Sequence, residues 1–197
     1  MQSLASIAIK SYLKLLRAFR RRQDLTLSEQ RNRLEHFAGI FRVPKTVRIE
    51  STRINQISVE WITPDDCSSD AVILYKHGGA YCAGSLNTHR AFLGRLALEC
   101  GCKVLNVDYR LAPESPFPAA LDDVFVAYNY LIKTFPAEKI VLAGDSADGG
   151  LSIALAMKLR DEKITLAAAC VLMAPWVDGC TAEPETPETK CPDVRRC

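Results

Sequence analysis

The chain has 197 residues, of which 48% are hydrophobic and 24% charged, and its formal net charge at pH 7 is +2. This length corresponds to about one domain with a sizeable core, and the composition is that of a globular protein. The small net charge gives no overall field for binding nucleic acid, so we expect no nucleic-acid partner. No run of about 18 apolar residues occurs, so no membrane-spanning helix is predicted.

The eight cysteines form no C-x-x-C pair and none stands at a zinc-binding distance from a histidine. We therefore expect no metal site and no cofactor. Reduced thiols fit a cytoplasmic protein. Four cysteines lie in apolar or glycine-rich runs and are predicted to be small buried side chains. These four are Cys82, Cys100, Cys102 and Cys170.

Two helices are predicted before the chain turns to strands. Basic side chains recur on one face of residues 4–22, opposite an apolar face. This pattern favours a packing helix, with a mitochondrial import segment as the alternative, since such segments are also basic and amphipathic. A second helix is predicted over residues 27–40, because Thr26 and Glu29 have the spacing of a capping box.

Strands and helices alternate through residues 45–178. Residues 71–75 form a continuous apolar run, as in a strand buried on both faces. The other predicted strands are 46–50, 54–62, 103–107, 139–143 and 166–173, and the predicted helices are 88–100, 119–134 and 147–161. This alternation implies an α/β fold with a mostly parallel sheet and helices on both faces. Residues 179–197 are polar and aperiodic and are predicted to be a disordered tail.

The most informative stretch is Gly144-Asp145-Ser146-Ala147-Asp148-Gly149-Gly150, which lies between a predicted strand and a predicted helix. A strand, a tight turn with a central serine and a helix are the layout of a nucleophile elbow. Such a turn exposes the serine hydroxyl, and the new helix directs free N–H groups at charge that develops there. The usual pattern is G-x-S-x-G, and here Asp148 takes the place of its last glycine.

A glycine loop, His77-Gly78-Gly79-Ala80, follows the strand at 71–76. Two consecutive glycines let the backbone turn and expose consecutive N–H groups, which an oxyanion hole requires. Such a loop alone fits an ordinary turn. Together with a serine elbow at another strand end, it favours acyl-transfer chemistry.

With two further segments, Asp108–Glu114 and Ala174–Asp178, these motifs resemble the hormone-sensitive-lipase-like serine esterases of the α/β-hydrolase superfamily. The resemblance implies an α/β-hydrolase-type sheet, with residues 1–44 forming an N-terminal helical cap. It also implies hydrolysis of a small-molecule acyl ester through an acyl-enzyme.

The site residues are assigned from the same resemblance. Ser146 matches the nucleophile, and the N–H groups of Gly78, Gly79 and Ala147 match the oxyanion hole. His77 would hold the glycine loop rather than act as a base. Arg110 and Glu114 match residues that brace the active-site loops, and they could also form a salt bridge with each other.

The catalytic acid and base are not found. The superfamily order is serine, then Asp or Glu, then histidine, whereas His36, His77 and His89 all precede Ser146. A sheet that is incomplete at its C-terminal side is therefore expected. His89 could substitute as a base, although the start of a helix is its expected place. The alternative function is a catalytically dead truncated fragment or a non-catalytic binding member of the same fold.

Asp148 leaves two alternatives open. Its side chain could turn to solvent, as a tolerated variation in the first turn of a helix. It could also lie near the oxyanion site, where a carboxylate would oppose the negative charge of the tetrahedral intermediate.

Overall fold

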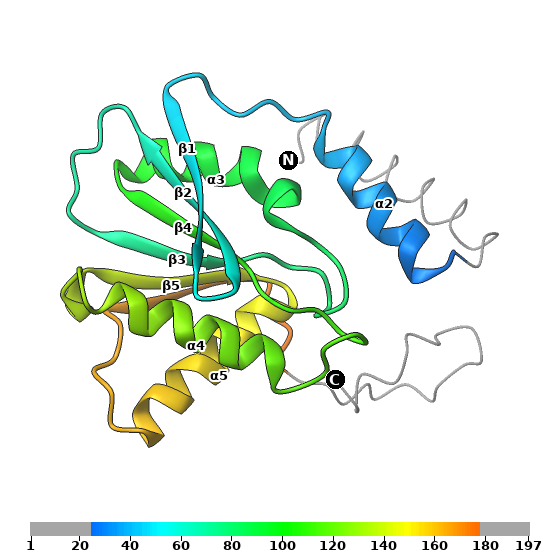
Figure 1. Cartoon of the computed structure of the whole chain (residues 1–197). Helices are drawn as coiled ribbons and strands as arrows, with labels where there is room; N and C mark the ends of the chain where they lie inside the picture. Colours follow the sequence, from blue (N-terminus) through cyan, green and yellow to red (C-terminus); the bar gives the residue numbers. More distant parts are fainter. Residues whose placement is uncertain (1–24, 178–197) are drawn as a thin grey trace, which may run out of the picture.

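A six-stranded sheet forms the centre of the protein (Figure 1), in a computed structural model that describes residues 25–177. Its strand order is β1-β2-β4-β3-β5-β6. The strands are β1 (Val47–Ile54), β2 (Ile57–Pro64), β3 (Val72–Lys76), β4 (Lys103–Asp108), β5 (Ile140–Asp145) and β6 (Ala169–Met173). The helices are α2 (Leu27–Ala38), α3 (Leu86–Cys100), α4 (Ala119–Leu131) and α5 (Ala147–Asp161), with a short 3-10 helix at Ala137–Lys139. The helix predicted over 4–22 and the tail predicted over 179–197 lie outside the described residues.

The expectation of a mostly parallel sheet is confirmed. Strands β4, β3, β5 and β6 run parallel, whereas β1 and β2 form a hairpin that joins β4 in antiparallel fashion. The hairpin turns at Asn55, whose φ of 55° is a left-handed conformation that asparagine tolerates. The turn therefore comes one residue later than the start predicted for the second strand. All parallel strands end at one edge of the sheet, where the loops before α3 and α5 begin.

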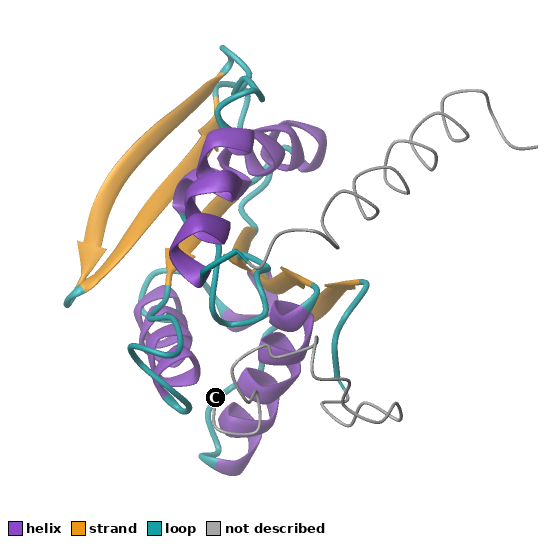
Figure 2. Cartoon of the chain, turned by 90° about the vertical axis from the view of Figure 1, so that its right-hand side faces the viewer, coloured by secondary structure: helices purple, strands orange, loops and turns teal. Residues whose placement is uncertain are grey.

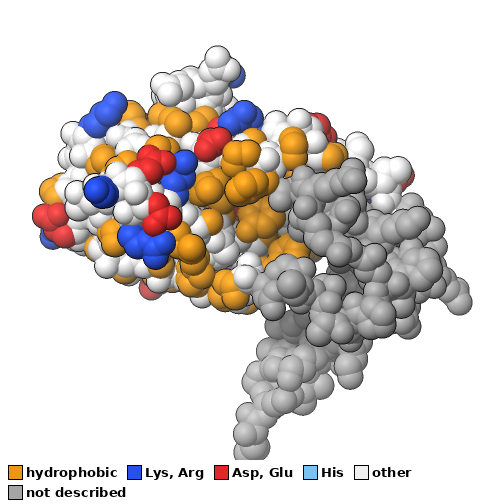
Figure 3. Space-filling model, turned by 90° about the horizontal axis from the view of Figure 1, so that it is seen from below, with side chains coloured by type: hydrophobic (Ala, Val, Ile, Leu, Met, Phe, Trp, Pro, Cys, Tyr) orange, Lys and Arg blue, Asp and Glu red, His pale blue; other side chains and the backbone are white. Residues whose placement is uncertain are grey.

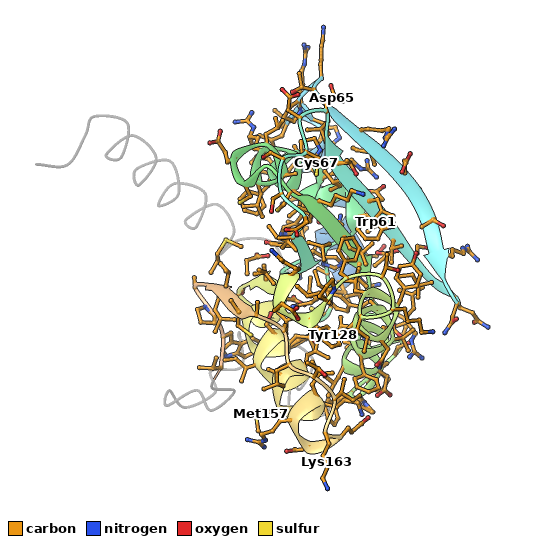
Figure 4. All side chains as sticks on the ribbon, turned by 90° about the vertical axis from the view of Figure 1, so that its left-hand side faces the viewer. Trp61, Asp65, Cys67, Tyr128, Met157 and Lys163 are labelled. Atoms are coloured by element: carbon orange, nitrogen blue, oxygen red, sulfur yellow. The ribbon has the colours of Figure 1, made fainter. Side chains whose placement is uncertain are left out.

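Helices cover both faces of the sheet, as predicted (Figure 2). On one face, Ile73 and Tyr75 of β3 pack in the cluster that contains Leu93 of α3. On the other face, Leu74 packs in the cluster that contains Leu155 of α5. Alternate residues of a strand point to opposite faces, so the run of buried residues in β3 reflects cover on both sides. Figure 4 shows side chains filling both layers, with Tyr128 of α4 in the interior.

Helix α2 is tied to the loops at the functional edge of the sheet. It begins with the predicted capping box between Thr26 and Glu29. Arg31 makes two hydrogen bonds to the carboxylate of Glu114, of 2.7 and 2.8 Å. The same guanidinium donates to the carbonyl oxygens of Cys82 and Ala112, at 2.7 and 2.9 Å. One arginine therefore anchors α2 both to the segment that follows the glycine loop and to the segment that follows β4.

Two of the four cysteines predicted to be buried are exposed. Cys82 and Cys102 are buried as expected, but Cys100 and Cys170 are exposed. Cys100 is the last residue of α3, and Cys170 lies on β6, the outermost parallel strand. The apolar neighbours of these two cysteines in the sequence could not predict their exposure. Exposure depends on where α3 ends and on which strand lies at the edge of the sheet.

Strand β6 is an uncovered edge within the described part of the chain. Val171 is 48% exposed, whereas most residues of β5, the strand that pairs with β6, are buried. Parallel strands are ordinarily covered on both faces and paired on both edges. Apolar side chains also reach the surface in the view of Figure 3. This edge agrees with the expectation of a sheet incomplete at its C-terminal side.

Two valines of the sheet test how far the β6 edge is covered in solution. Val104 of β4 is 0% exposed and Val171 of β6 is 48% exposed. We expect Val104→Ala to lower the free energy of unfolding by about 2 kcal/mol, because it removes two buried methyl groups and leaves a cavity. Val171→Ala should change it by less than about 0.5 kcal/mol. Urea unfolding of both variants measures the difference. Equal losses would show that β6 is covered.

Candidate active site

The turn around Ser146 has the geometry of a nucleophile elbow. Ser146 stands between the end of β5 and the start of α5, with a φ of 55° and a ψ of −122°. Its side chain is exposed, as an elbow requires. Gly144 permits the close turn, because a Cβ at this position would lie 2.5 Å from the carbonyl oxygen of Asp148. The predicted strand, turn and helix are therefore all present.

The segment after β6 holds this strained turn in place. The N–H of Ser146 donates to the carbonyl oxygen of Met173 at 2.9 Å, and the N–H of Trp176 donates to the carbonyl oxygen of Ser146 at 2.7 Å. A positive φ at a residue other than glycine persists only where surrounding contacts impose it. These two hydrogen bonds are such contacts: one comes from Met173 at the end of β6, and the other from Trp176 of the Ala174–Asp178 motif.

Asp145, the residue before the serine, joins three elements through one carboxylate oxygen. Its Oδ1 accepts from the hydroxyl of Tyr75 and from the N–H of Gly78, both at 2.8 Å, and lies 3.3 Å from Nε2 of His89. Burial acts to raise the pKa of Asp145, but these donors outweigh it and lower the pKa to about 2. Asp145 is therefore an ionised acceptor at neutral pH. The elbow pattern does not predict this role, because it leaves the residue before the serine unspecified.

The glycine loop presents free N–H groups, but not all of those expected. The N–H of Gly78 is bonded to Asp145, so the prediction that it faces an oxyanion is wrong. In residues 25–177, the N–H groups of Gly79, Ala80 and Ala147 have no hydrogen-bond acceptor. Ala80 was not among the predicted donors, and its φ of 54° continues the left-handed turn begun at Gly79. Three free donors near a serine hydroxyl can stabilise a negative oxygen.

The loop and the elbow are side by side. In the ladder between β3 and β5, Lys76 pairs with Gly144, so the loop starts at the level where the elbow starts. The hydroxyl of Tyr81 donates to the carbonyl oxygen of Ala147 at 2.7 Å. A Cβ on Gly78 would lie 3.0 Å from the backbone oxygen of Asp145, which explains why glycine is required there.

His77 stands at the start of the glycine loop, and its ring is enclosed by other side chains. Its ring is buried between Tyr109, at 4.6 Å between ring centroids, and His89, at 5.8 Å. Neither ring nitrogen has a hydrogen-bond partner among the described residues. Burial lowers the pKa of His77 to about 4. Enclosed in this way, the ring cannot exchange protons with a substrate at Ser146.

His89 lies in the first turn of α3, where it was expected. Its Nε2 faces Asp145, and its Nδ1 lies 2.9 Å from the hydroxyl oxygen of Thr88. Both ring nitrogens are thus directed at neighbouring protein groups. His36 is exposed on α2 and has no part in this arrangement.

Arg110 and Glu114 do not pair with each other. Arg110 binds Asp123 of α4, with its Nη2 at 2.7 Å from Oδ1 of that carboxylate, whereas Glu114 binds Arg31 of α2. The salt bridge between them that the sequence suggested is therefore wrong. Each residue instead anchors the segment after β4 to a different helix. Their partners are far apart in sequence and could not be inferred from the motif.

Asp148 is fully buried, so the alternative in which it turns to solvent is wrong. Its Oδ2 lies 2.8 Å from the hydroxyl of Tyr109, while its Oδ1 has no hydrogen-bond partner among the described residues. Lys76, at the end of β3, is also fully buried and its Nζ has no such partner. Burial raises the pKa of Asp148 well above its usual range and lowers that of Lys76 to about 8. Lys76 was not among the predicted site residues, although a lysine at the end of a buried apolar strand is a recognisable signal.

A pocket of about 180 Å³ lies between the segment after β4 and helices α4 and α5. It is lined by Tyr81, Arg110, Ala112, Ser115, Phe117, Ala120, Leu121, Leu151 and Ala154. Its lining is mostly apolar, as is typical of small-molecule sites. Across the described residues, no cluster of His, Cys, Asp and Glu suited to a metal ion occurs. None of the described helices is long and apolar enough to span a membrane.

Comparisons with known proteins agree with this geometry. A family model described as the alpha/beta hydrolase fold matches residues 73–195. A Mycobacterium tuberculosis protein named as a putative acetyl-hydrolase is 34% identical over 177 residues, which is 89% of this chain and 58% of the relative. The hormone-sensitive lipase of Homo sapiens is 38% identical over 104 residues, covering 50% of this chain and 10% of that protein.

A solved structure, an esterase from the bacterial hormone-sensitive lipase family, superposes with a TM-score of 0.81 at 36% identity. The match covers 90% of this chain and 60% of the esterase. The chain thus spans about three fifths of the length of this esterase and of the mycobacterial relative. Its sheet order, its elbow and these similarities show that the chain belongs to the alpha/beta-hydrolase family, among the hormone-sensitive-lipase-like proteins.

Proposed function

We propose that the chain carries the nucleophile and the oxyanion-binding groups of a serine carboxylesterase that acts on a small acyl ester. The observation that carries this proposal is the exposed Ser146 on a strained turn, beside the free N–H groups of Gly79, Ala80 and Ala147. The acetyl-hydrolase and esterase relatives support ester hydrolysis with a small acyl group. The predicted Gly79 and Ala147 are kept as oxyanion donors, and Ala80 replaces Gly78.

In the proposed reaction, Oγ of Ser146 attacks the ester carbonyl carbon. The carbonyl oxygen becomes negative and receives the three N–H donors, which are already fixed in place. The C–O bond to the alcohol then breaks, the alcohol leaves with a proton, and water later hydrolyses the acyl-enzyme. Serine is a weak nucleophile unless a base takes its proton.

The proton acceptor is the missing part of this mechanism. His77 is enclosed and His89 is directed at Asp145, so neither of the histidines near the elbow is placed as the base. The family order puts the acid and the base after the serine in the sequence. We infer that in this chain, on its own, Ser146 attacks without a base and is assisted only by the oxyanion donors and by substrate binding. Those contributions leave about 10³–10⁴-fold acceleration over water in a triad enzyme that has lost its triad.

Hydrolysis of a short-chain p-nitrophenyl ester tests the function. We expect slow turnover by the chain and a lower rate for Ser146→Ala, because the variant retains the donors but has no nucleophile. Release of p-nitrophenol, with an acyl-enzyme mass shift on Ser146, measures both. Ser152→Ala, on the same helix but fully buried, is the matched control and should not change the rate. Equal rates for the chain and Ser146→Ala would exclude the enzyme function and favour the non-catalytic alternative.

His89 provides a second test. If it only positions Asp145, then His89→Gln should reduce the rate by less than Ser146→Ala does, because Gln can still donate to Oδ1 of Asp145. The pH dependence of the rate should also be the same for His89→Gln as for the unaltered chain. A loss as large as that of Ser146→Ala, together with a vanished pH dependence, would instead identify His89 as the base.

A further inference from the structure

The hydroxyl of Tyr109 lies between two oxygen atoms. It is 2.8 Å from Oδ2 of Asp148 and 2.9 Å from the carbonyl oxygen of His77. A phenol has one hydrogen and can donate it to only one of them. The carbonyl oxygen can only accept, so the bond to His77 takes the hydrogen of Tyr109. The contact with Asp148 then needs a hydrogen from the carboxyl group itself.

The surroundings of Asp148 favour the same assignment. The side chain is 0% exposed, and its Oδ1 has no hydrogen-bond donor among the residues the structure describes. An ionised carboxylate is stable inside a protein only when several donors or a bonded cation satisfy its oxygens. A carboxylic acid needs much less compensation. Burial is also the main reason that the pKa of Asp148 is well above its usual range.

Within the described residues around Asp148, Lys76 is the one cation, and its positive charge would favour the ionised carboxylate. It pairs with Gly144 in the ladder, and a Cβ on Gly144 would lie 3.1 Å from Cβ of Asp148, so both side chains occupy the α5 side of the sheet. Yet Nζ of Lys76 and Oδ1 of Asp148 both lack a partner there, so no bonded ion pair forms. The ionisable groups that interact electrostatically with Asp148 are Lys76, Tyr75, Tyr81, Tyr109 and Asp145.

We propose that Asp148 is a neutral carboxylic acid that donates a hydrogen bond to Tyr109 and, through it, positions the His77–Gly78 peptide at the base of the glycine loop. Asp148 is thus a positioning residue. The N–H of the same peptide donates to Asp145. Two aspartates therefore hold one peptide from opposite sides, Asp145 as an ionised acceptor and Asp148 as a protonated donor.

The significance for catalysis rests on the proposed function. The peptide held in this way precedes Gly79 and Ala80, whose N–H groups are the proposed oxyanion donors. A neutral acid adds no negative charge beside a developing oxyanion, whereas a carboxylate would oppose it. The replacement of the usual glycine by Asp148 is then compatible with an oxyanion site.

The dependence of stability on pH tests the protonation state without reference to activity. Unfolded aspartate releases its proton near pH 3.9, so from about pH 5 to neutral pH a folded chain with a protonated Asp148 would hold one proton more than the unfolded chain. As the pH rises through this window, the folding constant of the chain should fall relative to that of Asp148→Asn, by up to about tenfold for each pH unit. Asn cannot ionise, and its amide can still donate to Tyr109. Lys76 contributes in the opposite direction only between its pKa of about 8 and the unfolded value of about 10.4, which lies outside this window.

Urea unfolding at several pH values measures this ratio. Parallel curves for the chain and Asp148→Asn would show that Asp148 is ionised and would overturn the proposal. Should the variant not fold, the infrared spectrum of the unaltered chain decides. A protonated carboxyl band at neutral pH that shifts on labelling aspartate with ¹³C supports the proposal, and its absence contradicts it.

Positioning of the loop is tested by amide exchange at Gly78. Tyr109→Phe removes the hydrogen bond to His77, and Asp148→Ala removes the hydrogen bond to Tyr109. The N–H of Gly78 should therefore exchange faster in each variant. Asp148→Asn should retain the original rate, because its amide can still donate to Tyr109. A merely space-filling role would be met by Asp148→Leu, which has a shape similar to Asn but cannot donate a hydrogen bond. Exchange at the original rate in Asp148→Leu would therefore contradict positioning by donation, and we expect faster exchange. An inactive chain that shows these effects would contradict only the proposed function. An active chain without them would contradict only this inference.

Discussion

Oδ1 of Asp145 is the point at which the separate parts of the site meet. Its three donors come from the strand β3, from the glycine loop and from α3, while its own backbone leads into Ser146. The positions of the loop and of the nucleophile are therefore not independent. Any shift of β5 relative to β3 would move the serine and would break the contact that orients the loop. The low pKa of Asp145 follows from these donors and keeps the oxygen an acceptor over the physiological range.

The strain at Ser146 is compensated by contacts on both sides of β5. On one side, the loop after β3 binds Asp145. On the other, Met173 and Trp176 bind the N–H and the carbonyl oxygen of Ser146. A φ of 55° at a serine is costly in an isolated turn, and these long-range contacts explain why it persists here. The same contacts leave the serine hydroxyl exposed, because they use only the backbone of the turn. A rigid support for a reactive side chain on a loop is how many hydrolytic sites are built.

The sequence predicted the sheet, the helices and the elbow well, because each depends on local periodicity or on a short motif. It failed where the answer depended on partners distant in the chain. The N–H of Gly78 bonds to a carboxylate 67 residues later, and Arg31 reaches Glu114 across 83 residues. The exposure of Cys170 and the burial of Asp148 likewise follow from strand order and helix docking. The helical cap assigned to residues 1–44 and the tail assigned to residues 179–197 stay predictions. Residues 1–24 and 178–197 lie outside the described part of the chain.

The structure separates two tasks that a serine esterase performs together. Stabilisation of the oxyanion needs the glycine loop and the start of α5, and both are fixed by contacts within residues 25–177. Proton transfer needs a base beside Oγ of Ser146, and the nearby histidines are engaged elsewhere. The elbow can therefore be fully shaped before any base is in place, because the hydrogen bonds that shape it do not involve the hydroxyl. A preformed elbow is consequently strong support for the family and, by itself, weak support for rapid turnover.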